Sequence, residues 1–575
     1  RKFFVQRADI DSLARWGFNS VRLPMHYALL SPAPGTYSEA GFVLIDSLLA
    51  WCEANHLYLI LDLHAAPGGQ NLGNISDYQG PPCLWESAAY QQWTAEIWKT
   101  IAGRYASREW IGGYDLLNET NYSFAAGNKP LRDLLMRITD SIRTVDRNHL
   151  IFAEGNSYAT DFSGLTPAWD ANMAWSFHKY WNTNDLNSIQ SYMNLRGASN
   201  TPLWMGESGE NSNQWFADAI ALLTRYNIGW SWWTLKKLET ISAPFSVTKS
   251  PKYDALLKYW SGSGGQPTVA DAVAALSEQA GLLDLAKCTF HPDFIDALMR
   301  LPFTDERKPY ADNVAPGNVF AVNYDMGKNW YSYYDTDFQN TGGGGYNLGW
   351  AYRNDGVDIQ PSTDPLGNGF NVGWTAAGEF LAYTLRVQTG GTYNIKIRCS
   401  SANAGTVAGT VRLSLDNAFL TPQISLPTTG GWQTWRSVDC GNYALAAGIH
   451  DLVVTCVSGG YNLSRLEFTQ ISSGVAEDRQ APRDFALGQN YPNPFNPTTV
   501  IGCQWPVASR VTLMVYDLLG REVARLIDGV RPAGTYAVTF DGTDLPSGLY
   551  FYRLTASPAG GGRTIIRTRA MALTR

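Results

Sequence analysis

Short apolar runs alternate with longer amphipathic segments over residues 1 to about 262. There are seven such runs, most of them apolar nearly throughout, as parallel strands covered on both faces are. They are residues 19–24, 57–64, 112–119, 149–154, 173–180, 202–207 and 229–235. Segments with helical periodicity lie between them, for example 86–107 and 131–147. This alternation predicts an α/β domain with a parallel sheet.

Seven strands are one fewer than a (β/α)8 TIM barrel needs. The first element, residues 5–17, reads as a helix that leads into the strand at 19–24. If the domain is such a barrel, its first strand lies upstream of residue 1. We therefore expect an open barrel with two unpaired strand edges, and with weakened stability and activity.

The pattern changes after residue 262. Residues 263–308 read as a helical tail and linker. From 309 to 471, short alternating runs separated by Gly- and Asn-rich turns predict a β-sandwich of the jelly-roll kind. A polar linker at 472–484 precedes a small, immunoglobulin-like β domain at 485–575. We predict a barrel, a sandwich and a terminal β domain in series.

Composition excludes some classes of partner. The net charge is only −7 and no long basic block exists, which argues against nucleic acid. No apolar run reaches the roughly 18–20 residues that span a bilayer. The seven cysteines are scattered and form neither a metal-binding pattern nor a dense disulfide framework, although one or two bridges remain open.

Polar and aromatic residues stand at the carboxyl ends of several predicted strands. One such residue alone is more often a helix cap, a hydrogen-bonded histidine or a core tryptophan. A set on successive strand ends favours a site, because a barrel builds its active site at that end. The set is Arg22, His64, Asn118, Glu119, His178, Tyr180, Glu207 and Trp233.

Two converging carboxylates among aromatic side chains suggest glycoside hydrolysis. One carboxyl must then carry a proton while the other is ionised. A separation of about 5–5.5 Å would indicate retention, and about 6.5–9.5 Å inversion. A metal site built on His64 and His178 lacks local ligand spacings such as HExxH, and a serine nucleophile lacks a GxSxG elbow.

The stretch PLWMGESGENSN (202–213) contains two glutamates that we assign different roles. Glu207 ends the apolar run, so it should point into the barrel mouth within reach of Arg22, Tyr180 and Glu119. Glu210 falls in a loop rich in Ser, Gly and Asn, where a capping or solvated role is expected.

Six motifs in residues 1–262 resemble glycoside hydrolase family 5, a family of retaining barrel enzymes: GFNSVRLP, LILDLHAAPGG, YDLLNET, FHKYW, LWMGES and GWSWWTLKK. The resemblance implies that Glu119 is the acid/base and Glu207 the nucleophile. It further implies that Asn118 contacts the sugar 2-hydroxyl, Arg22 and Tyr180 orient the nucleophile, His64 and His178 are the active-site histidines, and Trp233 is the floor under the cleaved sugar. Arg22 would keep Glu207 ionised, and a less polar site would raise the pKa of Glu119.

The predicted sandwich resembles carbohydrate-binding module family 6 through YDTDFQNTGGG, GVDIQ, NVGWTAAGEFLAYTL, TGGWQTW and GGYNLSRLEF. The resemblance implies that Trp374 and Trp432 sandwich a sugar, with Asn462 hydrogen-bonding it and Gln360 where a glutamate often helps. If both rings are exposed, the alternative that they are core is excluded. The family's calcium-binding Glu-Ala-Glu reads Phe320-Ala321-Val322 here, which argues against a structural calcium at that place.

The last ~90 residues resemble the C-terminal sorting domain of type IX secretion, through LGQNYPNPFNPTTVI, VTLMVYDLLGREVARL, AGTYAVTFDG and LPSGLYFYRL. We therefore expect a secreted or cell-surface retaining β-glycanase that needs no cofactor and has no membrane span. Its expected partners are the secretion machinery and a polysaccharide, which we expect to be a β-glucan. Cellulose-type β-1,4-glucan is the first choice of substrate. β-1,3-glucan is the runner-up, because HAAPGGQN resembles the motif of relatives that act on it, and mannan and xylan stay open. The rival is a non-catalytic carbohydrate-binding protein with a degenerate barrel.

Overall fold

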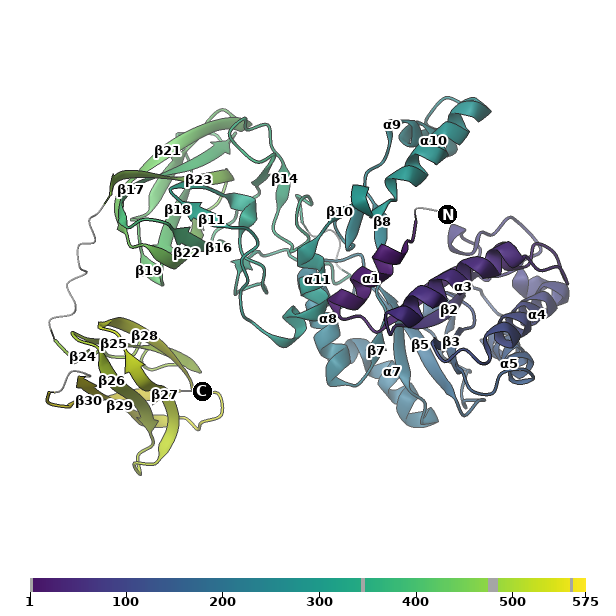
Figure 1. Cartoon of the computed structure of the whole chain (residues 1–575), viewed down its shortest axis with the longest axis horizontal. Helices are drawn as coiled ribbons and strands as arrows, with labels where there is room; N and C mark the ends of the chain where they lie inside the picture. Colours follow the sequence, from purple (N-terminus) through teal and green to yellow (C-terminus); the bar gives the residue numbers. More distant parts are fainter. Residues whose placement is uncertain (1–3, 343–346, 474–483, 559–561, 575) are drawn as a thin grey trace. The chain divides into compact units, whose positions relative to one another are not determined.

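The computed structural model describes residues 4–342, 347–473, 484–558 and 562–574. They form two compact units, Arg1–Gln388 with Tyr393–Ile471, and Thr389–Thr392 with Ser472–Arg575 (Figure 1). The first unit holds the barrel and the sandwich, and the second holds the terminal domain. Most of the linker expected at 472–484 lies outside the described residues.

A parallel sheet of seven strands, paired in chain order, forms the core of the barrel domain. Its strands are β1 (Ser20–His26), β2 (Tyr58–Ala65), β3 (Ile111–Asp115), β4 (Leu150–Glu154), β5 (Met173–Lys179), β6 (Leu203–Ser208) and β7 (Gly229–Trp230). Each strand predicted from sequence corresponds to one of them. The helices before and between them are α1 (Arg7–Trp16), α2 (Tyr27–Leu30), α3 (Glu39–Ala54), α4 (Ala88–Tyr105), α5 (Lys129–Arg143), α6 (Asn156–Ala159), α7 (Leu186–Ser199) and α8 (Asn213–Arg225).

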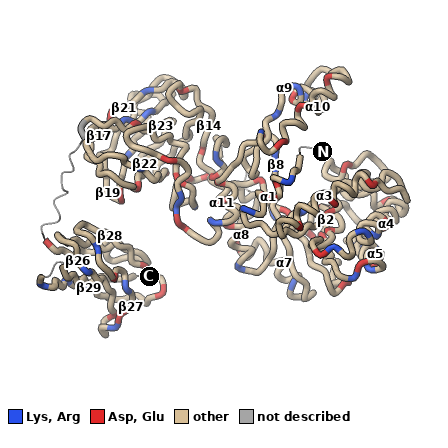
Figure 2. The backbone as a smooth tube through the Cα atoms, viewed as in Figure 1, with Lys and Arg blue, Asp and Glu red and all other residues tan. Residues whose placement is uncertain are grey.

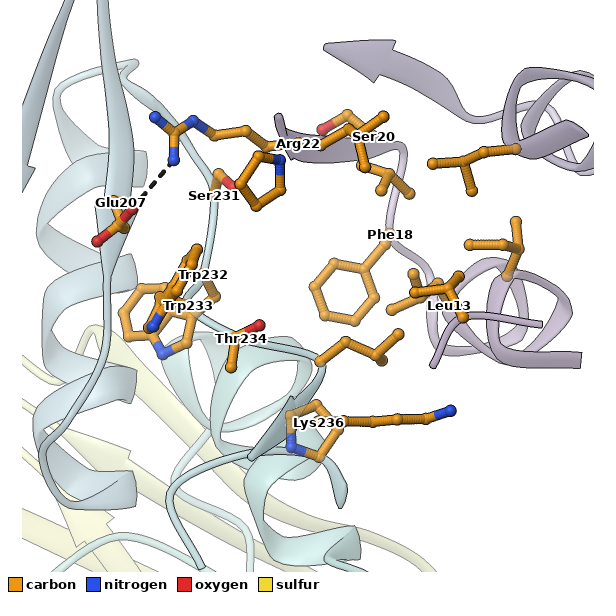
Figure 3. A pocket seen from close by; sticks show the side chains of 18 of the residues that line it. Leu13, Phe18, Ser20, Arg22, Glu207, Ser231, Trp232, Trp233, Thr234 and Lys236 are labelled. Carbon is orange, nitrogen blue, oxygen red and sulfur yellow. Dashed lines mark hydrogen bonds and ion pairs between the residues drawn. The ribbon is translucent and has the colours of Figure 1, made fainter. Parts of the chain in front are cut away.

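The barrel sheet is open between its first and last strands. Among the described residues, β1 pairs only with β2 and β7 only with β6. A cavity of about 1070 Å³ lies in the gap, and Figure 3 shows Leu13, Phe18 and Trp232 among the apolar side chains that line it. The expected open barrel is confirmed; its weakened stability and activity stay a prediction.

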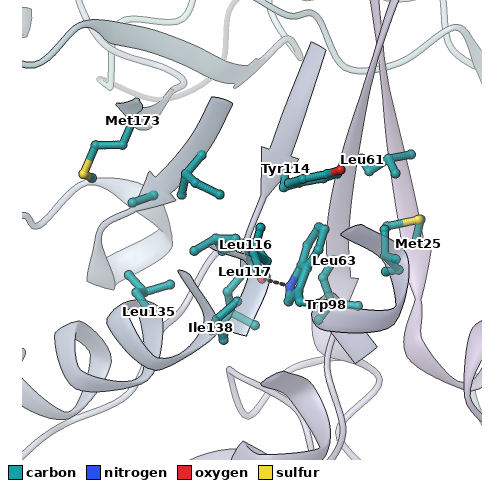
Figure 4. Packing of buried hydrophobic residues seen from close by; sticks show 14 of the residues in the cluster. Met25, Leu61, Leu63, Trp98, Tyr114, Leu116, Leu117, Leu135, Ile138 and Met173 are labelled. Atoms are coloured by element: carbon teal, nitrogen blue, oxygen red, sulfur yellow. Dashed lines mark hydrogen bonds between the residues drawn. The ribbon is translucent and has the colours of Figure 1, made fainter. Parts of the chain in front are cut away.

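Packing around β3 anchors the loop that follows it. Trp98 of α4 is fully buried, and its Nε1 donates a hydrogen bond to the carbonyl of Leu116 at 2.8 Å. Leu116 and Leu117 are buried beside it among residues of α5 and β2 (Figure 4). Because these leucines directly precede Asn118, the core fixes where that candidate residue lies.

The segment expected as a helical tail and linker packs partly into the barrel. It contains α10 (Val269–Leu282) and α11 (Pro292–Met299), and α9 (Pro251–Trp260) directly precedes it. Phe294 and Leu298 of α11 form a buried cluster with Phe216 and Ile220 of α8. A small sheet of β8 (Lys236–Leu238), β9 (Phe245–Val247) and β10 (Thr289–Phe290) lies beside it. Helix α11 is thus a packed part of the barrel domain.

Residues 313–473 fold into two β-sheets over one apolar core, as predicted for a sandwich. The first sheet contains β11 (Asn313–Ala315), β13 (Tyr333–Tyr334), β16 (Phe380–Val387), β18 (Val407–Leu415), β19 (Ala418–Phe419), β20 (Ile424–Pro427) and β22 (Gly448–Ser458). The second contains β12 (Gly317–Phe320), β14 (Ile359–Pro361), β15 (Phe370–Val372), β17 (Gly391–Ser401), β21 (Gly431–Leu445) and β23 (Asn462–Ser473).

The terminal domain is a small β structure with its own core. One sheet contains β24 (Ala486–Leu487), β25 (Thr498–Trp505) and β28 (Gly534–Asp541), and the other β26 (Ser509–Tyr516), β27 (Glu522–Arg531), β29 (Gly548–Pro558) and β30 (Ile565–Leu573). Across the described chain, basic and acidic residues are interspersed (Figure 2). Each described helix is too short or too polar to cross a membrane. All seven cysteines are free thiols.

Candidate active site

Glu207 sits at the end of β6 with each carboxylate oxygen held by a different donor. Arg22 Nη1, from β1, donates to Oε2 at 3.0 Å (Figure 3), and the hydroxyl of Tyr180 donates to Oε1 at 2.8 Å. The glutamate is only 7% exposed. Two donors on opposite oxygens fix the orientation of the group.

Arg22 is surrounded by carboxylates. Its guanidinium lies 2.9–3.2 Å from carboxylate oxygens of four residues. Burial alone would lower the pKa of Arg22, but these negative charges raise it well above its ordinary value. The four residues are Asp62, Asp115, Glu154 and Glu207.

Glu119 lies in the loop after β3, in a left-handed backbone conformation with φ of 44°. Its N–H donates to Glu154 at 2.6 Å, and its Oε1 is 2.8 Å from His178 Nδ1. A left-handed conformation is costly for a glutamate, and residues held this way cluster at functional sites. The bond to Glu154 helps to hold this strained turn.

The expected rise in the pKa of Glu119 is wrong. Burial does raise this pKa, but the hydrogen bond and positive charge of His178 outweigh burial, so the pKa lies below its ordinary value. For His178, burial lowers the pKa, and the charges of Glu154 and Glu207 with the bond to Glu119 raise it well above its ordinary value. In the free site, the shared proton therefore resides on His178.

The two candidate carboxylates converge as the sequence predicts. One oxygen of Glu119, one of Glu207 and one ring nitrogen of His178 all lie within 4.8 Å of one another. Their elements, the loop after β3, β5 and β6, are far apart in sequence, and the curved sheet brings their carboxyl ends together. The arrangement offers one anchored carboxylate beside a carboxylate–imidazole pair that can supply a proton.

The other expected barrel residues contact Arg22 and one another beside Glu119 and Glu207. Asn118 is fully buried; its Oδ1 accepts from Arg22 at 2.8 Å, and its Nδ2 lies 3.5 Å from His64 Nε2. His64 Nδ1 is 2.9 Å from Asp62. The rings of His64 and Trp233 stack with centroids 5.4 Å apart and planes 3° from parallel. The structure thus brings all eight predicted residues together.

Three buried acids of this site were not predicted. Glu154 contacts Glu119, His178 and Arg22, while Asp62 and Asp115 flank Arg22. Burial and the charge of Glu154 raise the pKa of Asp115 well above its ordinary value, which favours its neutral form despite the guanidinium at 2.9 Å. All three lie within or at the ends of apolar strands. An acidic residue in an apolar run was therefore the sequence signal that could have identified them.

Glu210 stands apart from the site, as expected, but it is neither a cap nor simply solvated. Its Oε1 pairs with Lys237 Nζ at 2.6 Å. The cap of α8 is Ser212, whose hydroxyl accepts from the N–H of Trp215. The loop after β6 is therefore fixed at several points beyond Glu207.

The sandwich exposes the two tryptophans expected to bind sugar. Trp374 is 46% exposed and Trp432 45%, which excludes the alternative that both are core. Asn462 donates to the carbonyl of Trp432 at 2.7 Å. A Cβ added at Gly373 would lie 3.0 Å from Asn462 Oδ1 and 3.6 Å from Gln360 Nε2, so the predicted polar pair lies beside one glycine. Their sugar-binding role stays a prediction.

Among the described residues, two acidic groups have oxygens or ring nitrogens close enough to hold a metal ion: Glu119 with His178 and Glu207, and Asp335 with Asp337 and Asp358. In the first, Arg22 and the protonated His178 already supply positive charge, which disfavours a cation. At the family's calcium position, Ala321 and Val322 are fully buried apolar residues, so this segment does not fit a calcium site.

A parallel barrel sheet with two carboxylates converging at its strand ends is an arrangement typical of glycoside hydrolases. Residues 2–239 match the family described as cellulase (glycosyl hydrolase family 5). Residues 350–472 match carbohydrate binding module family 6, and 489–566 the secretion system C-terminal sorting domain. The chain therefore joins a family 5 hydrolase domain to a carbohydrate-binding module and a sorting domain. The sorting domain directs the protein to the cell surface or the medium.

Curated relatives match parts of this chain in sequence. Endoglucanase C of Acetivibrio thermocellus is 25% identical over 300 residues, covering 41% of this chain and 85% of that protein. A Beta-xylosidase of Phanerodontia chrysosporium is 32% identical over 185 residues, covering 31% and 38%. A probable glucan 1,3-beta-glucosidase A of Aspergillus fumigatus is 28% identical over 160 residues, covering 28% and 38%. The chain thus spans less than half the length of the last two.

Proposed function

We propose that the barrel hydrolyses a β-glucan by double displacement, with Glu207 as nucleophile and Glu119 as acid/base. The observation that carries this proposal is the anchoring of Glu207 by Arg22 and Tyr180 with a Glu119 oxygen within 4.8 Å. Retention needs carboxyl groups about 5–5.5 Å apart, and the approach of one oxygen from each group to within 4.8 Å fits that requirement.

The two steps use this geometry directly. First, a Glu207 oxygen bonds to the anomeric carbon while the glycosidic oxygen leaves with a proton from Glu119. Because that proton resides on His178 in the free site, the histidine returns it through their 2.8 Å contact as the leaving oxygen takes it up. Then water attacks the anomeric carbon and frees Glu207, and the proton that the water loses passes to Glu119 and from there back to His178.

The preferred substrate is a β-1,4-glucan of the cellulose type. Likeness to endoglucanase C over 85% of its length supports this choice. The shorter match to a glucan 1,3-beta-glucosidase supports β-1,3-glucan as the alternative. Mannan and xylan are the other two polysaccharides whose hydrolysis should be compared.

The test is side-by-side hydrolysis of cellulose, laminarin, mannan and xylan by the full chain and two variants. Glu207→Gln should abolish release of sugar, whereas the matched Glu210→Gln, in the same loop but paired with Lys237, should retain it. Normal turnover by Glu207→Gln would show that the nucleophile is wrongly assigned. A first-formed product of inverted anomeric configuration, seen by NMR, would refute double displacement.

One observation favours a non-catalytic carbohydrate-binding protein as the second candidate. The open gap between β1 and β7 reaches Arg22, Glu207 and Trp233, so the sheet is incomplete beside the candidate site. Binding of the same polysaccharides without release of sugar would support this candidate over hydrolysis.

A further inference from the structure

The loop that follows Glu207 is hydrogen-bonded to the carbohydrate-binding module. Asn211 Nδ2 donates to the carbonyl of Asn340 at 2.7 Å, and the N–H of Asn340 donates back to Asn211 Oδ1 at 3.0 Å. The N–H of Asn213 donates to the carbonyl of Asn354 at 2.7 Å. Asn211, Asn213 and Asn354 are at most 1% exposed. Buried, satisfied bonds of this kind hold two surfaces in one arrangement.

An exposed tryptophan lies on the barrel side of this contact. Trp181 directly follows Tyr180, which binds Glu207, and it is 46% exposed. Its indole N–H donates to the carbonyl of Glu210 at 3.0 Å, and its own carbonyl lies 3.2 Å from where a Cβ of Gly342 would be. Trp181 therefore sits between the candidate nucleophile and the module.

A second exposed tryptophan lies on the module side. Trp350 is half-exposed, and its indole N–H donates to Asn354 Oδ1 at 2.8 Å. The amide nitrogen of Asn354 in turn donates to the carbonyl of Asn211 at 2.8 Å. Since Asn211 is bonded to Glu210 in the chain, a short path of hydrogen bonds joins the two indoles.

A close packing contact links Trp350 to the residues expected to bind sugar. A Cβ at Gly349, the neighbour of Trp350, would lie 2.6 Å from the ring of Trp374, so only glycine permits this approach. Both Trp374 and Trp181 have left-handed backbones, with φ of 46° and 45°. That conformation is unfavourable for a bulky residue, and its repetition at two exposed rings indicates that ring placement is constrained.

We propose that Trp181 and Trp350 form an intermediate binding site that carries one β-linked glycan chain from the candidate catalytic residues to Trp374 and Trp432 of the module. Each indole is fixed through its N–H while its ring is exposed, which leaves a flat apolar face for the carbon-bound hydrogens of a pyranose. Single exposed tryptophans need no explanation, but these two are linked by contacts to the candidate catalytic residues on one side and to Trp374 on the other. The proposal rests on the proposed function, since a chain must enter the cleft.

Isothermal titration calorimetry on the Glu207→Gln background tests the site with cellotriose and with a long soluble cellulose derivative. A ligand spanning several linked sites gains affinity from each, so Trp350→Ala should lower the ratio of long-chain to cellotriose affinity about tenfold. Trp181→Ala should lower the ratio similarly. Trp260→Ala removes an exposed tryptophan from α9 and should leave the ratio unchanged. The matching β-1,3 ligands serve if the enzyme prefers laminarin.

Trp350→Phe separates stacking from folding, because it keeps a ring but loses the N–H. It should preserve most of the ratio; a loss equal to that of Trp350→Ala would overturn the stacking role. A ratio in Trp350→Ala equal to that in Trp260→Ala would overturn the intermediate site while leaving the proposed function intact, provided that the parent enzyme hydrolyses glucan. If the parent neither binds nor cleaves any glucan, the proposed function itself fails, and the intermediate site with it.

Discussion

Tyr180→Phe is the most direct measure of how Glu207 is held. The change removes one hydroxyl, which donates to Oε1 of Glu207 at 2.8 Å, and leaves Arg22 on the other oxygen at 3.0 Å. A hydrogen bond to a charged group contributes about 1.5–3 kcal/mol. If that energy is expressed in the transition state, kcat/KM falls by about ten- to 150-fold, since 1.36 kcal/mol corresponds to tenfold.

The assay is initial-rate kinetics on an aryl β-cellobioside, with folding checked by circular dichroism. Because the hydroxyl orients the nucleophile rather than the substrate, kcat should fall with little change in KM. Tyr192→Phe is the matched control, since it removes a hydroxyl from a buried tyrosine on α7 outside the site. A Tyr180→Phe enzyme as active as this control would refute the argument that two donors position Glu207.

Three further predictions concern the buried polar residues Glu154, His291 and Asn213. Glu154→Ala should lower the free energy of unfolding by on the order of 3 kcal/mol, because it deprives a buried imidazolium of one partner; an unchanged urea midpoint would contradict this. Burial lowers the pKa of His291 to about 4, so the folded chain stays unprotonated where the unfolded chain binds a proton. Stability should therefore be full above pH ~6.5 and fall toward pH 4 by on the order of 3 kcal/mol; thermal unfolding of wild type and His291→Gln across that range should diverge, and parallel curves would count against burial as the cause. Asn213→Ala removes an amide that donates to both Asp293 and Asp355, leaving two buried carboxylates short of a donor, and should lower Tm and speed proteolysis between barrel and module.

Much of the site followed from strand periodicity. Glu207 and Tyr180 end or follow apolar runs, and the rule that barrel strands present their carboxyl ends on one side was enough to bring them together. Glu154 ends a similar run, yet nothing local distinguishes it from a strand-end acid that caps a helix. Only the three-dimensional contacts with Glu119 and His178 identify it.

The protonation state of Glu119 could not be predicted from the sequence, for a related reason. The expectation of a raised pKa considered burial alone, whereas the outcome depends on one 2.8 Å contact with His178 across 59 positions. The contact of Asn213 with Asn354, which are 141 positions apart, could not be predicted from the sequence either. Periodicity predicts which face a residue occupies, but pairwise distances decide its electrostatics.

The open sheet and the intact site can coexist because different interactions hold them. β1 lacks a neighbour on one side among the described residues, which should lower stability. Arg22, however, is held from inside the sheet by close contacts with Asp62 on β2, Asp115 on β3 and Glu154 on β4. These contacts do not depend on what fills the gap. We therefore expect the opening to lower the melting temperature more than the turnover rate of the molecules that remain folded, so weak stability and weak activity, predicted together from the sequence, should separate in measurement.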